Sequence, residues 1–427
     1  MTARPIQPRL FEPAQRGVSG AGAIVIDFIF AAALASLFLP FQWQTPVGYT
    51  RPFDYLSILC VVAAMSRLGG GAFVITRSML PHLAYLAVYV ISALTVSAIN
   101  GVREIIQIFT VLFFLGPLVA YVRSRPDNKV FVIASALLLA LCAYAIYWHI
   151  AHRYFVGWKI LDEPKAIFIF LPAMLAAALP GPGQRQPWWA LPAIAAMMVI
   201  IILSGERKAY MTGAVFIAAY FGVLNPRLLI VAAIGALALP ILAAADPQGY
   251  VARQLDTVIN PPHVENLYTL DYVNMPSSLS NAQRQFSWEV GMQLLAREPF
   301  FGIGTNQYGE LMNARFGYLP SYLRLDIHGE FQRSLVENGI IGVALYAIAW
   351  VFALFALLRH VRVTKLLTGM KGRELTLTLL FAGAFVFCAF EAQKSLSMVA
   401  FVGAGLLGLL LPAQQFAKPA PPRAQRA

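Results

Sequence analysis

The chain has 427 residues, of which 59% are hydrophobic and only 12% are charged, and it carries a net charge of +12. A soluble globular domain has about 25% charged residues, so this composition excludes an ordinary soluble protein. Apolar runs of roughly 17 to 25 residues recur along the chain, and such runs can cross the hydrocarbon core as helices. The sequence therefore predicts an all-α polytopic membrane protein.

Twelve runs have the character of membrane spans. In chain order they cover residues 22–40, 54–66, 80–99, 104–122, 130–150, 166–180, 188–204, 209–224, 228–245, 334–358, 375–390 and 397–412. No small-residue cleavage site and soluble segment follow the first run, so we expect a retained first helix instead of a removed signal peptide.

Basic residues alternate between the loops, and this pattern orients the chain. One set of loops, which includes both terminal segments, holds 18 of the 32 Lys and Arg residues. The short loops of the opposite set hold 8, and the remaining 6 lie in the long segment 246–333. Because positively charged loops face the cytoplasm, we expect both termini there and segment 246–333 on the far side. The basic excess then follows from topology, which argues against nucleic acid as a partner.

The expected organisation has four parts. Residues 1–245 hold the first nine spans, 246–333 form one large outer loop, 334–412 hold the last three spans, and 413–427 are a disordered cytoplasmic tail rich in Pro and basic residues. The outer loop is the one part outside the predicted spans that is large enough to fold.

Patterned segments within the outer loop predict local structure. Residues 281–299 have apolar side chains at three-to-four spacing, which predicts an amphipathic helix capped by Ser280 or Asn281 and ended by Pro299. Gly302 and Gly304 lie in "FFGIGTNQY". That stretch lacks the third glycine and the preceding strand of a dinucleotide-binding loop, so it predicts a turn leading into a second short helix.

Cysteine spacing and absent motifs restrict the chemistry. Cys60, Cys142 and Cys388 all fall inside apolar runs, so neither a disulfide framework nor a structural zinc site is expected. The sequence contains no HExxH, CxxC or GxSxG motif, and the first outer loop lacks a pair of acidic residues. We therefore expect chemistry that uses no metal and no cofactor.

Several polar residues on the expected outer face need an explanation. Arg207 and Lys208 lie between two spans, Arg284 lies one helical turn before Trp288, and His328 lies just before the tenth span, at the expected level of the lipid headgroups. Each has a structural interpretation: a helix-end cap for the first pair, packing over the indole for Arg284, and a satisfied buried imidazole for His328. Those interpretations stay open for each residue alone.

Taken together, these residues resemble the O-antigen ligase and Wzy-type polymerase family of bacterial envelope glycosyltransferases. The similarity is densest from 284 to 342, in "EPFFGIGTNQY", His328 and "FQRSLVENGIIG", and it includes Arg207 in "SGERKAY". In the last element we expect Gly339 and Gly342 to allow close helix approach.

Three positions depart from the family pattern. Gly329 replaces a usual Asn, Glu206 replaces a usual Ser, and "LDEPKAIF" stands where a Pro-Asn pair is common.

The resemblance implies an enzyme of the bacterial inner membrane that uses a glycan linked to undecaprenyl pyrophosphate, with its active site on the periplasmic face. Arginine forks suit a pyrophosphate, so Arg207, Arg284 and Lys208 are its expected ligands. His328 is the expected base, and Glu330 orients it or shares its role. The further candidate substrate contacts are Arg324, Arg333, Arg315, Asn306 and Trp288.

Two activities share this chemistry. A polymerase extends another lipid-linked repeat unit, whereas a ligase transfers the glycan to lipid A–core, and the altered His-Asn element favours a polymerase of O-antigen or exopolysaccharide. Expected partners are the lipid-linked donor, either acceptor, the bilayer and other polysaccharide-assembly proteins. A lipid-linked sugar transporter is the alternative from a different class. It should carry charges at mid-membrane and two related halves, whereas here Asp27 is the main charge inside a span.

Overall fold

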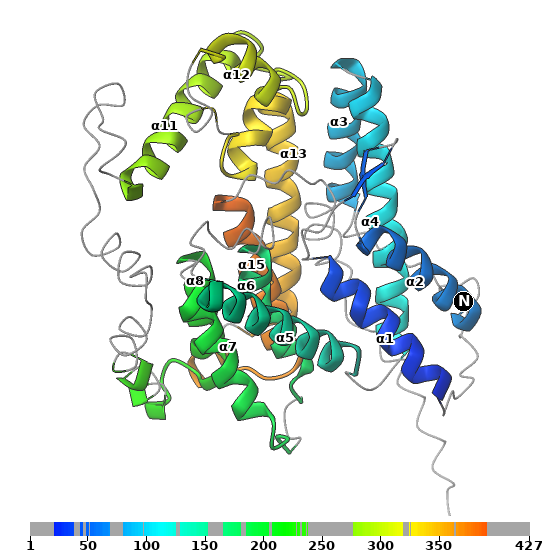
Figure 1. Ribbon diagram of the computed structural model, residues 1–427, viewed down its shortest axis with the longest axis vertical. Helices are drawn as coiled ribbons and strands as arrows, with labels where there is room; N and C mark the ends of the chain where they lie inside the picture. The colour runs from blue at the N-terminus through cyan, green and yellow to red at the C-terminus, as the bar shows by residue number, and fades with distance from the viewer. Residues whose placement is uncertain are drawn as a thin grey trace, which may run out of the picture.

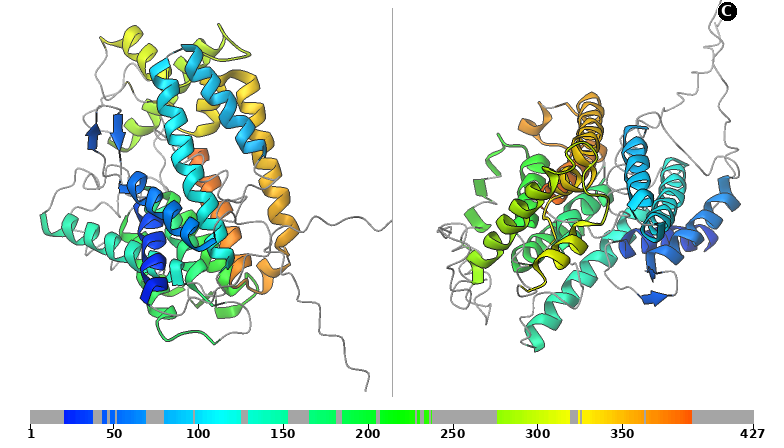
Figure 2. Two further views of the ribbon diagram at one scale, coloured as in Figure 1. Left: turned by 90° about the vertical axis from the view of Figure 1, so that its right-hand side faces the viewer. Right: turned by 90° about the horizontal axis from the view of Figure 1, so that it is seen from above.

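The computed structural model describes part of the chain (Figures 1 and 2). The described residues are 21–37, 43–45, 48–50, 52–68, 80–96, 98–124, 129–152, 165–180, 185–204, 207–227, 229–230, 233–235, 237, 276–318, 324, 326–362 and 364–390. Within them the chain is helical apart from one two-stranded antiparallel hairpin in the first predicted outer loop, which the sequence did not predict.

The elements run in chain order as α1 (Ala21–Ser36), β1 (Trp43–Thr45), β2 (Gly48–Thr50), α2 (Pro52–Leu68), α3 (Leu80–Val96), α4 (Ala98–Ser124), α5 (Lys129–His152), α6 (Lys165–Ala178), α7 (Ala190–Ser204), α8 (Arg207–Phe221), α11 (Pro276–Leu295), α12 (Tyr308–Phe316), α13 (Glu330–His360), α14 (Lys365–Thr368) and α15 (Arg373–Phe390). Ten of the twelve predicted runs contain one of these helices. The runs at 228–245 and 397–412 and the tail 413–427 lie wholly or mostly outside the described residues, so the count of twelve spans and their orientation stay predictions.

The helices of the bundle pack through one large apolar core. Helix α6 lies against α5, α8 and α15, and its residues 167–176 are almost entirely buried. Among the described segments, Glu330–Arg359 has the length and apolarity of a membrane-crossing helix by composition, but it is divided at Gly339, and seven shorter apolar helices accompany it. Cys60, Cys142 and Cys388 are buried and are not linked by disulfides.

The main charge inside a predicted span has a local partner. Asp27 of α1 is 1% exposed and accepts a hydrogen bond of 2.7 Å from the hydroxyl of Tyr121 on α4. The Tyr121 ring stacks on Phe30, with 4.6 Å between the ring centroids. Because a buried polar group is costly unless it is hydrogen-bonded, this contact explains Asp27 as a link between two helices.

Helix α13 reverses direction at Gly339. This residue has φ 67° and ψ −167°, which divides the element into a short helix over residues 330–338 and a long helix over 340–360. The Phe331 ring lies 4.8 Å from that of Tyr346 and 6.2 Å from that of Trp350, between centroids. A straight helix would separate Phe331 and Tyr346 by about 22 Å, so the short helix folds back along the long one (Figure 1).

The reversal is held by the glycine turn predicted at residues 302–304. The N–H groups of Ile303 and Gly304 donate to the carbonyls of Val336 and Glu337, at 3.0 and 2.9 Å. In return the Ile340 N–H donates to the carbonyl of Pro299 at 3.0 Å. A break in a helix leaves such backbone groups without intrahelical partners, and this turn satisfies them.

Two glycines allow that contact. A Cβ at Gly302 would lie 2.5 Å from the Glu337 carbonyl oxygen, and one at Gly339 would overlap the Phe300 carbonyl. The two backbones therefore touch directly, with φ 71° at Gly302 and φ 67° at Gly339. The predicted turn is confirmed, whereas the interpretation of Gly339 as a helix-approach glycine is wrong, because this residue makes the reversal itself.

The predicted helices of the outer loop are present. Helix α11 begins at Pro276 rather than at Ser280 or Asn281, and α12 is the predicted second short helix. Seven buried side chains form a small core between these helices and the start of α13: Phe286, Val290, Leu294, Tyr308, Met312, Ile327 and Val336. This core attaches α11 and α12 to the fold-back helix.

Candidate active site

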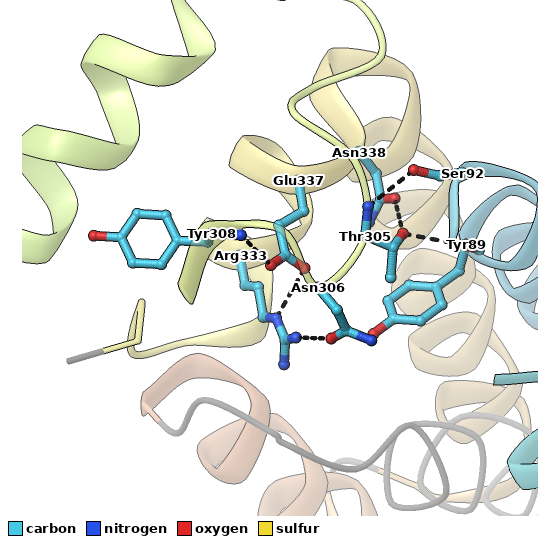
Figure 3. Close-up of polar contacts among 8 residues, drawn as sticks. All are labelled: Tyr89, Ser92, Thr305, Asn306, Tyr308, Arg333, Glu337 and Asn338. Carbon is cyan, nitrogen blue, oxygen red and sulfur yellow. Dashed lines mark hydrogen bonds and ion pairs between the residues drawn. The ribbon is translucent and has the colours of Figure 1, made fainter. Parts of the chain in front are cut away.

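The best-defined polar network of the described residues centres on Arg333 of the fold-back helix (Figure 3). Its Nε donates to Glu337 Oε2 at 3.0 Å, and its Nη2 donates to the side-chain oxygen of Asn306. The other oxygen of Glu337 accepts from the backbone N–H of Tyr308 at 3.4 Å. The side chains of Arg333 and Glu337 are 12% and 2% exposed, so this ion pair is largely shielded from water.

Tyr308, the first residue of α12, extends this network. Its hydroxyl donates to the Ser287 carbonyl of α11 at 2.8 Å, and its side chain is buried. Burial raises the pKa of Tyr308 above its ordinary value. The phenol therefore stays neutral and acts as a hydrogen-bond donor between α11 and α12.

Glu337 supplies a first test of this network. Glu337→Gln keeps the side-chain shape but leaves the buried guanidinium of Arg333 without its counter-charge, which we expect to cost about 3 kcal/mol of stability. The measurement is the midpoint of thermal unfolding in detergent. Glu289→Gln on the exposed face of α11 is the matched control, with an expected change below about 0.5 kcal/mol. Equal midpoints for the two variants would contradict the buried ion pair.

The geometry of His328 assigns its tautomer. Its Nδ1 lies 3.0 Å from the backbone carbonyl oxygen of Asp326. A carbonyl can only accept, so Nδ1 carries the hydrogen of the neutral ring and Nε2 carries the lone pair. A neutral imidazole held in this way can accept a proton at Nε2.

The fold-back helix also changes the location of His328. The sequence interpretation placed this residue one turn before a span that begins near 334. Since Glu330 starts a helix that runs back along Tyr346 and Trp350, the His328–Glu330 segment instead lies beside the long helix, about 9 to 15 Å along it from the reversal at Gly339.

Glu330 lies in a buried environment. It is 1% exposed and begins the fold-back helix, whose next residue, Phe331, packs against Tyr346 and Trp350 of the long helix. The structure thus gives the predicted acidic residue a low-dielectric site next to His328 in the chain.

Gly329, the departure from the family pattern, has a local physical cause. It has φ 104° and ψ 123°, and a Cβ there would lie 2.9 Å from the carbonyl oxygen of Ala389 at the end of α15. Only glycine adopts this conformation at low cost. The chain therefore needs glycine where α13 begins against α15.

Restoring the family residue at Gly329 should be harmful. Gly329→Asn would strain the backbone and crowd Ala389, so we expect the free energy of unfolding to fall by at least about 2 kcal/mol. Ala296→Asn is the control, because Ala296 is exposed just after the end of α11, outside the predicted spans. Full stability of Gly329→Asn, measured as the unfolding midpoint, would show that the crowding is absent.

Arg207 and Lys208 begin α8, whose far end is fixed. The Met370 N–H, next to the start of α15, donates to the Ala219 carbonyl at 2.6 Å. Helix α8 also packs against α15. Because its last turn lies near the start of α15, its first residues lie toward the other end of α15, where Ala389 contacts Gly329. Lys208 is buried there, and the side chain of Arg207 lies outside the described residues.

The remaining predicted residues fall into different settings. Arg284 and Trp288 lie half-buried on α11, where the indole packs against the small core. Arg324 donates to Asn313 at 2.6 Å, and Arg315 is exposed, with its guanidinium 5.3 Å from the Phe316 ring centroid. Of the predicted substrate contacts, the described structure joins Asn306 and Arg333 in one network.

The sequence did not predict which residues support this network through hydrogen bonds. They are Thr305, Glu337 and Asn338 near the reversal, together with Tyr89 and Ser92 of α3. The sequence contained one usable signal for these supports. Glu337 and Asn338 are polar residues directly before a glycine in an apolar run. No local pattern links them to α3, more than 200 residues earlier.

These features define a class: an integral membrane protein in which a polar site forms where a short helix folds back beside an apolar one. The model of the O-antigen ligase family matches residues 192–347. This segment of the chain is therefore similar to the O-antigen ligase family, as the motif resemblance predicted, and it contains α8, α11, α12 and the reversal in α13. No match was found among curated proteins.

Proposed function

We propose that the protein is a metal-independent glycosyltransferase of the bacterial inner membrane. It transfers a glycan from undecaprenyl pyrophosphate to an acceptor hydroxyl on the periplasmic face. The proposal is supported by the fold-back of residues 330–338: Gly329, between His328 and Glu330, lies against Ala389 at the end of α15, and α8 begins toward that same end.

The reaction follows from the chemistry of these groups. His328 Nε2 takes the proton of the acceptor hydroxyl as its oxygen attacks the anomeric carbon. The bond from that carbon to the pyrophosphate breaks, and undecaprenyl pyrophosphate leaves with the electron pair. Arg207, Lys208 and Arg284 stabilise the charge on this leaving group, since guanidinium forks match phosphate oxygens. Attack opposite the leaving group inverts the anomeric centre.

The acceptor distinguishes two forms of this activity. We propose polymerisation of O-antigen or exopolysaccharide repeat units as the first. Transfer to lipid A–core is the second candidate, and the description of the matched family, O-antigen ligase, favours it. Other polysaccharide-assembly proteins would supply the donor and remove the product.

One experiment tests the proposal and separates the two acceptors. Purified full-length protein is incubated with an undecaprenyl-pyrophosphate oligosaccharide, a chelator, and either a second lipid-linked unit or lipid A–core. We expect release of undecaprenyl pyrophosphate with an elongated acceptor. Elongated lipid-linked product indicates a polymerase, and modified lipid A–core indicates a ligase. Absence of transfer to both, with donor movement across vesicles, would indicate a transporter instead.

A further inference from the structure

The turn that carries Asn306 is anchored to α3, far outside the matched segment. The N–H of Thr305 donates to the Ser92 hydroxyl at 3.1 Å. The Thr305 hydroxyl lies 3.1 Å from the Tyr89 carbonyl oxygen and 2.8 Å from Asn338 Oδ1 (Figure 3). Thr305 is fully buried, so water does not compete for these bonds.

This anchor precedes a residue with a left-handed backbone conformation. Asn306 has φ 62°, the one positive value among the described residues other than glycine. Asparagine tolerates this conformation in turns, and the contacts on both sides of Asn306 hold it there. Here Thr305 is tied to α3 on one side, and the Tyr308 N–H is tied to Glu337 on the other.

The conformation of Asn306 determines where its side chain points. Its oxygen accepts from Arg333 Nη2, while Glu337 accepts from Nε of the same guanidinium. Two acceptors on different elements therefore orient one planar cation. An orientation fixed in advance by such supports makes an anion contact precise without further ordering.

We propose that Thr305 is a positioning residue for glycosyl transfer: it ties the turn to α3 and, through Asn306, orients the guanidinium of Arg333 for contact with the donor pyrophosphate. This inference rests on the proposed function, and it makes α3 part of the active site. A pyrophosphate that carries one negative charge on each phosphate suits a pre-oriented arginine better than a lysine, because the guanidinium presents a fixed fork of donors.

The test uses purified full-length protein and an undecaprenyl-pyrophosphate oligosaccharide, with released undecaprenyl pyrophosphate as the readout. Thr305→Val keeps the side-chain volume but loses the hydroxyl, and we expect kcat to fall by about ten- to a hundredfold. Thr305→Ser restores the hydroxyl and should stay within about threefold of the parent protein. Thr376→Val, which loses a comparable hydroxyl bond to Gly372, should transfer normally.

A double-mutant cycle separates positioning from a purely structural role. In an Arg333→Lys background, Thr305→Val should lower the residual rate by less than about twofold, because the group that Thr305 positions is gone. An equal loss in both backgrounds, or a failure of Thr305→Ser to restore transfer, would overturn the inference. If the unmodified protein transfers no glycan, the proposed function fails and the inference fails with it.

Discussion

Gly339→Ala should abolish the folded, active protein. The substitution places a Cβ against the Phe300 carbonyl and demands φ 67° with ψ −167°, a region that only glycine adopts readily. The strain and the lost turn contacts should together cost at least about 4 kcal/mol, which exceeds the usual effect of one mutation. The readouts are the amount of monodisperse protein after detergent extraction and its unfolding midpoint.

Gly235→Ala is the matched control for this substitution. It adds the same methyl group where nothing lies within 4 Å, so yield and midpoint should match the parent protein. Gly302→Ala, on the other side of the same contact, should reproduce the damage of Gly339→Ala. Normal yield of both turn variants would show that α13 does not reverse through this glycine contact.

The largest effect on catalysis is expected for His328→Ala. Loss of the imidazole removes the nitrogen that we propose takes the acceptor proton, and such groups contribute about 10²- to 10⁴-fold to the rate. Transfer to the acceptor should fall by this factor while the yield and unfolding midpoint change little, because His328 is half-buried at the start of the fold-back helix.

Added imidazole gives this prediction a specific control. If the ring acts as a base, exogenous imidazole should restore part of the transfer by His328→Ala, and it should not affect Glu337→Gln. If His328→Ala transfers glycan at the rate of the parent protein, His328 is not the base. Loss of folded protein without catalytic rescue would favour the structural interpretation of His328.

Several features of this protein could be predicted from the sequence because they depend on local patterns. Long apolar runs predict membrane helices, since the backbone must satisfy its own hydrogen bonds in lipid. The three-to-four spacing of Phe286, Val290 and Leu294 predicted the buried face of α11. The motif order around His328 predicted the family that residues 192–347 match.

Other features depended on contacts between distant residues. A helix pattern continues unbroken through Gly339, and only the backbone contact with Gly302 explains why the chain reverses there. The sequence interpretation of one continuous span near 334–358 therefore missed the fold-back helix. That reversal sets His328 beside the long helix instead of before it.

The sequence by itself determined the composition of the proposed site: a histidine, its neighbouring acidic residue and a set of arginines in the order of a known family. Only the tertiary structure decided which of these residues come into contact. Arg333 meets Asn306, which directly follows Thr305, a residue bonded to α3, and no local pattern records a bond between Ser92 and Thr305, which are 213 positions apart. Such pairings depend on how distant helices pack against one another, because this packing brings together the few groups that form the hydrogen bonds.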